Sequence, residues 1–451
     1  MAKQATYAAK TLIVGLGTTG LSCARYLAAQ GESLAVTDTR ENPPGLEALR
    51  KDYPDMAMFL GGFQTDVFNA ASRLVVSPGV SLDEPLIRSA KQRHIEILGD
   101  IELFARAAKA PVVAITGSNG KSTVTTLLGE MARMAGKHVA VGGNLGEPAL
   151  ELLDDSVELY ILELSSFQLE STRSLKSKAA VVLNVSADHM DRYSDLDEYA
   201  ATKASIYAGS EIKVINRDDP KVAAMAVADE VTIGFTLDSP TEGDFGLYER
   251  EGIKWLSEGH VPLMPVTELR IPGRHNIANA LAALALGKAV GLALNDMLGA
   301  LRHYSGLPHR TQWVCDKGGV HWYNDSKGTN VGATIAALQG LHPENGSSRS
   351  VLIAGGDCKD ADFSPLAPVA EETARVVILI GKDASKLEAA LTGRVQMMHA
   401  ASLQQAVGLA AELAQPGDRV LLSPACASFD MFRNFEARGE AFIQAVEALQ
   451  A

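Results

Sequence analysis

Residues 116–123 read TGSNGKST and combine the residue types that bind a nucleotide triphosphate. They lie between an apolar, strand-like run at 111–115 and a helix-like run that begins at Val124. A glycine-rich turn at this place directs backbone N–H groups to one point, where the helix N-terminus adds partial positive charge. Lys121 supplies a cation for the β- and γ-phosphates and Ser122 a ligand for Mg²⁺. The spacing departs from the usual P-loop, because Ile115 occupies the place of its first glycine. The residues expected at the triphosphate are Gly117, Asn119, Gly120, Lys121, Ser122 and Thr123.

A second glycine pattern, Gly15-x-Gly17-x-x-Gly20, follows the apolar run at 11–15, and Asp38 ends the next strand-like run. An acid roughly 20 residues after such glycines is typical of a dinucleotide site. Taken alone, the pattern indicates an NAD-dependent dehydrogenase. The glycines report only a tight turn where a phosphate approaches backbone amides, and a UDP group offers the same pyrophosphate and ribose. The pattern therefore predicts a nucleotide diphosphate site, with a packing turn that binds no ligand as the alternative.

Three further residues lie where metal or phosphate chemistry is expected. Glu163 ends an apolar strand, and an acid at the tip of a neighbouring strand often completes the Mg²⁺ shell of a P-loop enzyme. His189 follows another strand and is a candidate metal or substrate-orienting residue, although no paired histidine spacing supports zinc. Spacing alone leaves Lys203 as a lysine on a helix surface.

The last third of the chain has polar loops where strand-like runs end. These loops are NDSKGTN at 324–330, GGDCK at 355–359 and SPACASFD at 423–430. If they share one edge of a sheet, they form a pocket with Lys327 and Lys359 as its cations. Solvated loops are the alternative.

Apolar runs alternate with helix-like segments along the whole chain, which predicts three α/β domains with mainly parallel sheets and ligands at the carboxyl ends of the strands. We expect a Rossmann-like N-terminal domain over 1–99, a P-loop-type central ATPase domain over 100–306 and a Rossmann-like C-terminal domain over 307–451. A small antiparallel addition is expected near 244–266, and the last helix near Phe429. The other predicted strands are 11–15, 33–37, 73–77, 112–116, 159–164, 180–185, 213–216, 351–354, 376–380 and 420–422, and the other predicted helices 276–290 and 296–303.

Composition narrows the class of protein. The 451 residues carry 41 Lys and Arg against 54 Asp and Glu, a formal charge of −13 that argues against nucleic acid as a partner. The four cysteines are scattered and read as thiols in a reducing compartment. No signal peptide and no run of about 18 apolar residues is seen, so no membrane insertion is expected. We therefore expect a cytoplasmic protein, and a monomer.

Taken together, the motifs resemble those of the Mur ligases over about 10–438. The motifs that carry the resemblance are TGSNGKST at Thr116, ELSSFQLE at Glu163, NVSADHMDRY at Asn184, HNxxNA at His275, LPHR at Leu307, NDSKGTN at Asn324 and SPACASFDMFRNF at Ser423. The P-loop form and HNxxN are shared with the wider superfamily, including folylpolyglutamate synthetase. The C-terminal block, SPG at Ser77 and GDIELF at Gly99 single out the branch that adds D-glutamate. Ser118 and Gly328 stand where Thr and Ala are common in the family.

The resemblance assigns roles that spacing alone does not. Lys203 matches a carbamylated lysine, formed with CO₂, which together with His189 marks a second Mg²⁺ site. The metal residues would be Ser122, Glu163, His189 and carbamylated Lys203. The further residues at ATP or its metal would be Asn276, His309, Arg310 and Asp325. The UDP-substrate residues would be Gly15, Leu16, Gly17, Thr18, Asp38, Thr39, Arg40, Ser77, Gly79 and Asn144. The D-glutamate residues would be Thr329, Lys359, Ser423 and Phe429.

The implied activity is ATP-dependent addition of D-glutamate to UDP-N-acetylmuramoyl-L-alanine through an acyl phosphate, a step of peptidoglycan precursor synthesis. Lys121, His189, Lys203 and Lys327 are the candidate catalytic residues. The cofactors would be ATP, two Mg²⁺ ions and the lysine carbamate. A folylpolyglutamate-type ligase, an NAD dehydrogenase and a nucleotide-binding regulator without turnover are the competing interpretations.

Overall fold

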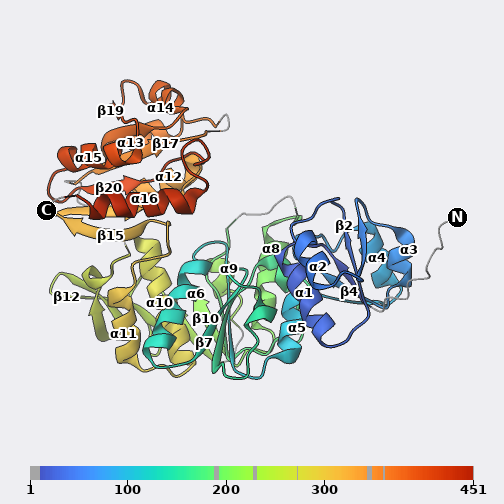
Figure 1. The fold of residues 1–451 in the computed structure, drawn as a ribbon. Helices are drawn as coiled ribbons and strands as arrows, with labels where there is room; N and C mark the ends of the chain where they lie inside the picture. The colour runs from blue at the N-terminus through green and yellow to red at the C-terminus, as the bar shows by residue number, and fades with distance from the viewer. Residues whose placement is uncertain are drawn as a thin grey trace. The chain divides into compact units, whose positions relative to one another are not determined.

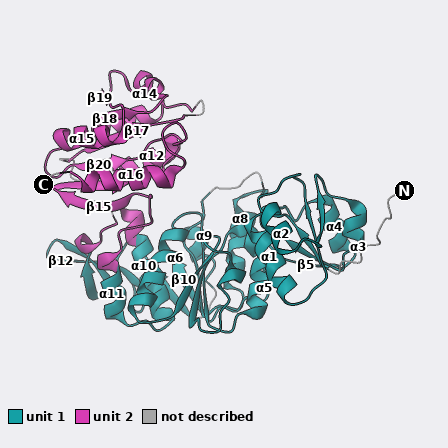
Figure 2. Ribbon diagram, viewed as in Figure 1, with its two compact units in different colours: residues 1–265, 278–300 teal, residues 266–277, 301–451 magenta. Residues whose placement is uncertain are grey.

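The computed structural model describes residues 11–186, 192–226, 231–271, 273–342, 348–358 and 361–449. Two residues named above, His189 and Lys359, lie outside these ranges. The chain divides into two compact units, one with residues up to Pro265 and Ala278–Ala300, the other with Val266–Ile277 and the residues from Leu301 onward (Figure 2).

The first unit begins with a parallel five-stranded sheet of order β3-β2-β1-β4-β5. The strands are β1 Thr11–Val14, β2 Leu34–Asp38, β3 Ala57–Leu60, β4 Arg73–Val76 and β5 Glu96–Leu98. The helices are α1 Thr18–Ala29, α2 Leu46–Asp52, α3 Thr65–Ala70 and α4 Pro85–Gln92 (Figure 1). Every residue of β1 and β2 is buried, as expected for strands covered on both faces. The strand order reverses between β1 and β4, which is where such sheets bind ligands.

The same unit contains a nine-stranded sheet of order β14-β13-β12-β11-β10-β9-β6-β8-β7. Its strands are β6 Val112–Thr116, β7 Val139–Gly143, β8 Leu159–Glu163, β9 Ala179–Val182, β10 Ile212–Asn216, β11 Thr232–Phe235, β12 Phe245–Arg250, β13 Ile253–Glu258 and β14 Val261–Pro265. Its helices are α5 Asp100–Ala107, α6 Lys121–Met134, α7 Ser166–Leu169, α8 Leu196–Ala204, α9 Pro220–Ala223, and most of α10 Arg274–Ala289 and α11 Leu294–His303, with 3-10 turns at Ala149–Leu152 and Ser205–Tyr207. The 3-10 turn Val266–Glu268, the start of α10 as far as Ile277 and the end of α11 from Leu301 belong to the second unit. The strands from β7 to β12 pair in parallel and those from β12 to β14 antiparallel. The parallel order reverses at β6, between β8 and β9, so the turn after β6 also lies at a ligand-binding edge.

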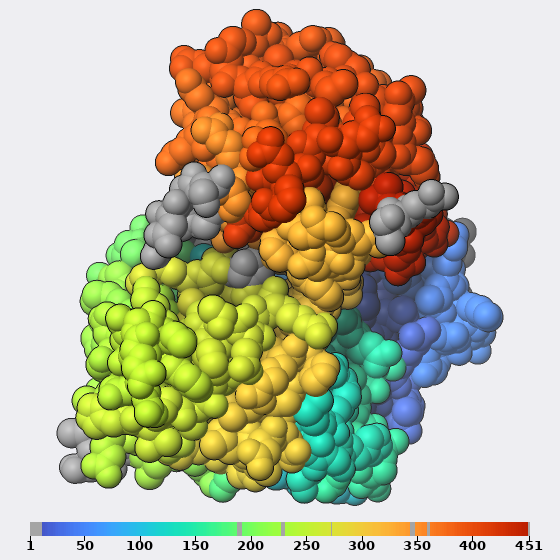
Figure 3. All heavy atoms as spheres, turned by 90° about the vertical axis from the view of Figure 1, so that its left-hand side faces the viewer, coloured from blue at the N-terminus to red at the C-terminus, as the bar shows by residue number. Residues whose placement is uncertain are grey.

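The two sheets of this unit share one hydrophobic core. Leu27 of α1, Phe104 of α5 and Leu150 belong to the same buried cluster. The antiparallel strands β12 to β14 form the edge of the large sheet that ends in β14 (lime green in Figure 3). Ile253 of β13 and Val261 of β14 are exposed. The first two predicted sheets therefore pack as one body in this structure.

The second unit has a six-stranded sheet of order β15-β16-β20-β17-β18-β19. The strands are β15 Gln312–Lys317, β16 Val320–Asn324, β17 Ser350–Gly355, β18 Ala374–Ile380, β19 Gln396–His399 and β20 Arg419–Leu422, and the helices α12 Val331–Leu341, α13 Leu366–Thr373, α14 Ala384–Leu391, α15 Leu403–Leu413 and α16 Phe435–Glu447. Only the edge pair β15–β16 is antiparallel among the described pairs. One face packs on α12 to α14 and the other on α15 and α16, which gives two separate cores.

The structure confirms three α/β sheets and the antiparallel addition near 244–266. The predicted start of the last helix near Phe429 is wrong. Helix α16 begins at Phe435, because the Asn434 side chain accepts a hydrogen bond from the N–H of Ala437 and caps the helix there. The edge strands β3, β7 and β19, which are mostly half-buried, were not among the predicted strands.

The expectation of four thiols is wrong for one pair. Cys358 and Cys426 form a disulfide, whereas Cys23 and Cys315 are free. The pair lies 68 residues apart in sequence, and it meets because the loops after β17 and β20 follow neighbouring strands. Sequence spacing does not show such a meeting. In the described part of the chain, no helix is both long and apolar enough to cross a membrane.

Candidate functional site

The turn between β6 and α6 has the conformation that the TGSNGKST segment predicts. Lys121 is the first residue of α6, and Gly120 before it adopts a φ of 83°, which a side chain would strain. A Cβ atom at Gly120 would also collide with Oδ1 of Asn279 in α10. The Lys121 ammonium donates hydrogen bonds to the carbonyls of Gly117 at 2.9 Å and Ser118 at 3.0 Å. The turn therefore holds its cation next to the first turn of a helix, where N–H groups lack intrahelical acceptors.

A second loop, after β9, braces this turn. The N–H of Asn119 donates to Oδ1 of Asn184 at 2.8 Å, and the Asn184 amide donates back to the Asn119 carbonyl at 3.1 Å. Ser118 and Ser186 exchange two further hydrogen bonds of 2.9 and 3.0 Å. Because β6 and β9 are adjacent strands, these loops lie at the same sheet edge. Part of the NVSADH motif therefore fixes the shape of the phosphate-binding turn.

Lys203, in the last turn of α8, is buried against the same turn. Its Nζ donates to the Gly117 carbonyl at 3.1 Å and lies 4.5 Å from the centre of the Tyr199 ring. The interpretation of Lys203 as a surface lysine is therefore wrong. Two lysines, Lys121 and Lys203, donate to one carbonyl oxygen at the start of the phosphate-binding turn.

Glu163 ends β8 beside β6 and is buried. Its Oε1 accepts a hydrogen bond of 2.7 Å from the Asn144 amide, whereas Oε2 is buried with no hydrogen-bond partner among the described residues. The next residue, Leu164, accepts a hydrogen bond of 2.7 Å from the Thr116 hydroxyl of the phosphate-binding strand. A buried carboxylate oxygen without a donor is costly unless a cation neutralises it, and Mg²⁺ prefers such oxygen ligands. This oxygen of Glu163 therefore suits a magnesium ion as one ligand.

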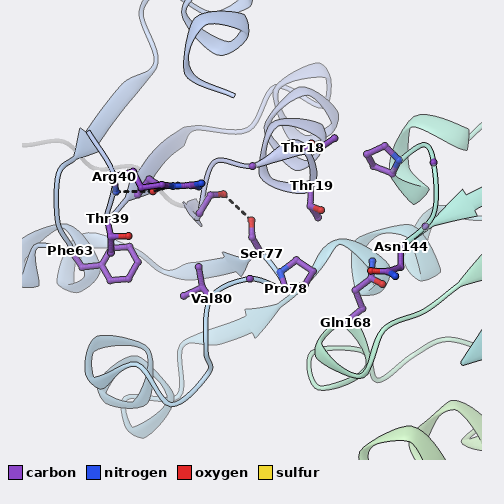
Figure 4. Close-up of a pocket in the computed structure, with 17 residues that line it drawn as sticks. Thr18, Thr19, Thr39, Arg40, Phe63, Ser77, Pro78, Val80, Asn144 and Gln168 are labelled. Atoms are coloured by element: carbon purple, nitrogen blue, oxygen red, sulfur yellow. Dashed lines mark hydrogen bonds and ion pairs between the residues drawn. The ribbon is translucent and has the colours of Figure 1, made fainter. Parts of the chain in front are cut away.

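A cavity of about 580 Å³ lies at the carboxyl ends of β1 and β4 (Figure 4). Thr18 and Thr19 face it from α1, Asn144 from the loop after β7 and Gln168 from α7. The predicted residues that line it are Gly15, Gly17, Thr18, Asp38, Thr39, Arg40, Ser77, Gly79 and Asn144. The lining residues that the sequence did not identify are Thr19, Phe63, Pro78, Val80, Gly143, Gly146, Pro148 and Gln168. The structure therefore brings the predicted UDP-substrate residues together around the cavity, except Leu16. Leu16 is fully buried and does not line the cavity.

Asp38 is held by its neighbours. Its carboxylate accepts hydrogen bonds from the Leu16 N–H at 2.7 Å, from the Arg40 N–H at 2.9 Å and from two guanidinium nitrogens of Arg40 at 2.8 and 2.9 Å. Burial alone would raise the pKa of Asp38, but these hydrogen bonds outweigh it and lower the pKa to about 2. Asp38 is therefore an anion that fixes the glycine turn and orients Arg40 toward the cavity.

The glycines of the first turn have different physical roles. A Cβ at Gly20 would collide with the Gly15 carbonyl, so that glycine permits the close packing of α1 on β1. A Cβ at Gly17 would meet no atom within 4 Å, because Gly17 faces the cavity. The Ser77 hydroxyl donates to the Gly15 carbonyl at 2.8 Å and joins the turn to the loop after β4. This arrangement leaves space where a pyrophosphate can approach the backbone.

The predicted residues of the second unit centre on Asp325. The Ser423 hydroxyl donates to its Oδ2 at 2.6 Å and the Thr311 N–H to its Oδ1 at 2.9 Å. Burial raises the pKa of Asp325 to about 6 in spite of these hydrogen bonds. His309 is buried with Nδ1 2.9 Å from the Asn324 amide, and burial lowers its pKa. Ser423 and Asp325 are thus linked within one buried cluster.

The other predicted residues of this unit are more accessible. Lys327 is exposed with Nζ 4.2 Å from the centre of the Phe435 ring, and Arg310 and Thr329 are exposed. Phe429 exposes 66% of its surface. Asn276 also belongs to this unit, in the first turn of α10. The roles given to these residues toward ATP and D-glutamate remain predictions.

Sequence reasoning missed the structural roles of Asn184, Asn279 and Gln168. All three belong to recognised motifs, but their partners are far away in the sequence. Asn184, for example, lies 65 residues from its partner Asn119. The Gln168 amide accepts from the Ser165 N–H at 3.1 Å and donates to the buried Asp100 at 2.9 Å, which fixes its place in the cavity wall. The one feature of the sequence that could have indicated these roles is that each is a polar residue within a recognised motif.

Family models match all three sheets. A Mur ligase MurD-like N-terminal domain matches residues 9–99, a Mur ligase middle domain 115–287, and a Mur ligase glutamate ligase domain 309–426. Two solved structures with the same fold are a UDP-N-acetylmuramoyl-L-alanyl-D-glutamate–2,6-diaminopimelate ligase (TM-score 0.59, 19% identity, covering 97% of this chain and 92% of that one) and the UDP-N-acetylmuramate–alanine ligase of Thermotoga maritima (0.57, 18%, 97% and 99%). The fold and the three matched family models thus define a Mur-type ligase class, with a glycine-rich turn after β6 and a cavity at the carboxyl ends of β1 and β4.

The chain belongs to the Mur ligase family. It is 56% identical to the UDP-N-acetylmuramoylalanine–D-glutamate ligase of Nitrosococcus oceani over 99% of this chain and 98% of the relative. It is 53% identical to the enzyme of the same name from Pseudomonas aeruginosa, over 97% and 98%.

Proposed function

We propose that this chain is the ATP-dependent ligase that adds D-glutamate to UDP-N-acetylmuramoyl-L-alanine in peptidoglycan precursor synthesis. Relatives that are 52–56% identical to this chain over nearly their full length are named UDP-N-acetylmuramoylalanine–D-glutamate ligase. We propose that residues 1–99 bind the UDP substrate, that residues 100–306 bind ATP, and that residues 307–451 bind D-glutamate and close over ATP.

One observation carries the proposal. Asn144 lines the nucleotide cavity and donates a hydrogen bond of 2.7 Å to Glu163, which lies beside the phosphate-binding strand. A substrate that fills the cavity past Asn144 therefore presents its far end to the edge where Glu163, Lys121 and Lys203 gather. A UDP-linked sugar that ends in a carboxylate has the chemistry for this path.

The carboxylate of the substrate must be activated, because an oxide ion cannot leave it. Attack of that carboxylate on the γ-phosphorus of ATP gives an acyl phosphate and ADP. Bringing two anions together in a site of low dielectric costs several kcal/mol, on the order of 4 kcal/mol at 4 Å for an effective dielectric constant of 20. The Lys121 ammonium, next to the turn, offsets this repulsion and stabilises charge on the transferred phosphoryl group. Magnesium bound at Glu163 and Ser122 would supply further charge neutralisation.

The amine of D-glutamate then attacks the acyl carbon, and phosphate leaves. We assign Thr329, Lys359, Ser423 and Phe429 to D-glutamate, because they match the positions that hold it in the family, and the Lys327 cation to the tetrahedral intermediate. We further propose that His309, Arg310, Asp325 and Asn276 reach ATP when the second unit closes, with 306–310 as the hinge.

Lys203 is proposed to act as a carbamate. As an ammonium it would repel a cation, whereas addition of CO₂ gives a carboxylate-like oxygen ligand for Mg²⁺. Its burial against Gly117 favours this assignment, since the site limits access of water to the adduct. His189 is proposed as its partner at a second Mg²⁺ ion. The cytoplasm, where ATP and nucleotide-linked precursors are made, is the proposed compartment, and a monomer the proposed state.

The test is phosphate release with each substrate left out in turn. We expect release only when ATP, Mg²⁺, UDP-N-acetylmuramoyl-L-alanine and D-glutamate are all present. Absorbance changes of a nicotinamide cofactor would support a dehydrogenase, and release with a folate plus L-glutamate a folylpolyglutamate-type ligase. Either result without release in the full D-glutamate mixture contradicts the proposal.

A further inference from the structure

Arg192 connects two parts of the first unit that lie 114 residues apart in sequence. Its guanidinium donates to the Pro78 carbonyl at 3.0 Å and to the Val80 carbonyl at 3.5 Å. Pro78 and Val80 belong to the loop after β4 and line the nucleotide cavity (Figure 4). Only 14% of the Arg192 side chain is exposed, so these are contacts of a largely buried group.

Two residues of the α7 segment hold the guanidinium from the other side. The Arg192 Nη2 donates to Oε2 of Glu170 at 2.6 Å, and the Arg192 Cζ atom lies 4.2 Å from the centre of the Phe167 ring. The Glu170 side chain is 17% exposed. A planar guanidinium can serve a carboxylate, two carbonyls and a ring face at once, whereas a lysine ammonium cannot cover all four. The residue type therefore matches the four partners.

The Glu170 carboxylate is also connected to Lys203 through aromatic side chains. The Tyr193 hydroxyl donates to Oε1 of Glu170 at 2.6 Å, and burial together with that hydrogen bond raises the pKa of Tyr193, so the phenol remains a donor. The Tyr193 ring lies 6.2 Å from that of Phe167 and 5.1 Å from that of Tyr199, whose ring centre is 4.5 Å from Nζ of Lys203. Glu170 thus joins the cavity loop to the aromatic side chains beside Lys203.

We propose that Arg192 is a positioning residue that holds the Ser77–Val80 loop in the conformation that binds the UDP-linked substrate, with Glu170 fixing the guanidinium. The inference deepens the proposed function and rests on it for the identity of the ligand. Arg192 binds the loop through backbone carbonyls, so it restricts the loop without competing for the substrate. A loop already held in its bound conformation loses less entropy on binding.

The substitution that tests this role is Arg192→Ala, with Arg192→Lys as the conservative variant. Calorimetry with UDP-N-acetylmuramoyl-L-alanine is expected to show a Kd about tenfold higher for Arg192→Ala, which corresponds to about 1.4 kcal/mol. The KM for that substrate should rise by the same factor, while the KM for ATP stays within about twofold. Arg192→Lys should lie between wild type and Arg192→Ala, because it can keep the ion pair with Glu170 but not both carbonyl contacts.

Arg394→Ala serves as the matched control, since it removes an exposed arginine paired with Glu371 in the second unit. It should leave Kd and KM unchanged. A lower melting temperature or kcat for Arg192→Ala with unchanged Kd and KM would show a purely structural role and overturn the inference. If Arg192→Ala does not fold, equal Kd values for Arg192→Lys and wild type overturn it in the same way. Wild-type protein that binds the substrate but releases no phosphate with D-glutamate contradicts the proposed function instead.

Discussion

The first unit contains two glycine-rich turns that each join a buried strand to a helix, one between β1 and α1 and one between β6 and α6. At the first, Asp38 and Arg40 neutralise each other, and an open cavity lies beside the glycines. At the second, Lys121 and Lys203 donate to the Gly117 carbonyl beside a carboxylate oxygen of Glu163 that lacks a hydrogen-bond partner among the described residues. The same backbone arrangement thus carries a neutralised ion pair at one site and, at the other, the Lys121 cation beside a carboxylate oxygen that suits a metal ion.

The difference separates binding from chemistry. The neutralised Asp38–Arg40 pair suits a diphosphate that only has to be bound. The charged groups at the second turn suit a γ-phosphoryl group, because its charge redistributes during transfer. Substitutions at the second turn should therefore change kcat or the KM for ATP, and those at the first turn should change stability or the affinity for the UDP-linked substrate.

Lys121→Ala should lower kcat on the order of 10³-fold, because it removes a cation from the phosphoryl group in the transition state. The Kd of UDP-N-acetylmuramoyl-L-alanine, measured by calorimetry, should not change. Steady-state kinetics with phosphate detection provides the rate. A kcat within a few-fold of wild type, or an equal loss of UDP-substrate binding, would remove the distinction between the two turns.

Lys203→Ala should lose most of its activity and recover part of it in acetate or propionate, because a small carboxylate can replace the proposed carbamate. The matched control is Lys213→Ala, which removes another buried lysine near an aromatic ring, on β10. Any loss in that variant should not respond to the added acid. Full activity of untreated Lys203→Ala would contradict the role.

Asn184→Ala should raise the KM for ATP about tenfold, since it removes two hydrogen bonds of about 1 kcal/mol each from the phosphate-binding turn. The KM for the UDP-linked substrate should stay constant. Asn330→Ala, which removes the cap of α12, is the control for a general loss of stability. An effect on the UDP-linked substrate in place of ATP would mean that the two turns are not independent.

Asp38→Asn should have the smallest effect, a loss of about 1 kcal/mol in the free energy of unfolding near pH 7. The lowered pKa of Asp38 means that its carboxylate stabilises the folded state above the unfolded-state pKa of about 3.9, and that this contribution is lost as pH falls toward about 2. Urea unfolding from pH 7 to pH 3 should therefore show the difference between variant and wild type shrinking as pH falls. A constant or growing difference would contradict the ion pair's role.

The local parts of both turns were predictable from sequence. A buried strand, glycines at fixed spacing and a helix are neighbours along the chain, so Lys121, Asp38 and Glu163 could be placed by pattern. The brace from Asn184, the burial of Lys203 and the Arg192 contacts depend on residues 65, 86 and 114 positions from their partners. Hydrophobic periodicity reports which face of an element is buried, and it does not report which polar atoms meet across two loops.

The central claim is that the phosphate-binding turn uses ATP to activate a carboxylate. The direct measurement uses UDP-N-acetylmuramoyl-L-alanine with ¹⁸O in both carboxylate oxygens, ATP and D-glutamate, with mass spectrometry of the released phosphate. An acyl phosphate requires one ¹⁸O atom in each phosphate released, because the carboxylate oxygen leaves with phosphorus when the amine attacks. Amide product formed with unlabelled phosphate would contradict the mechanism.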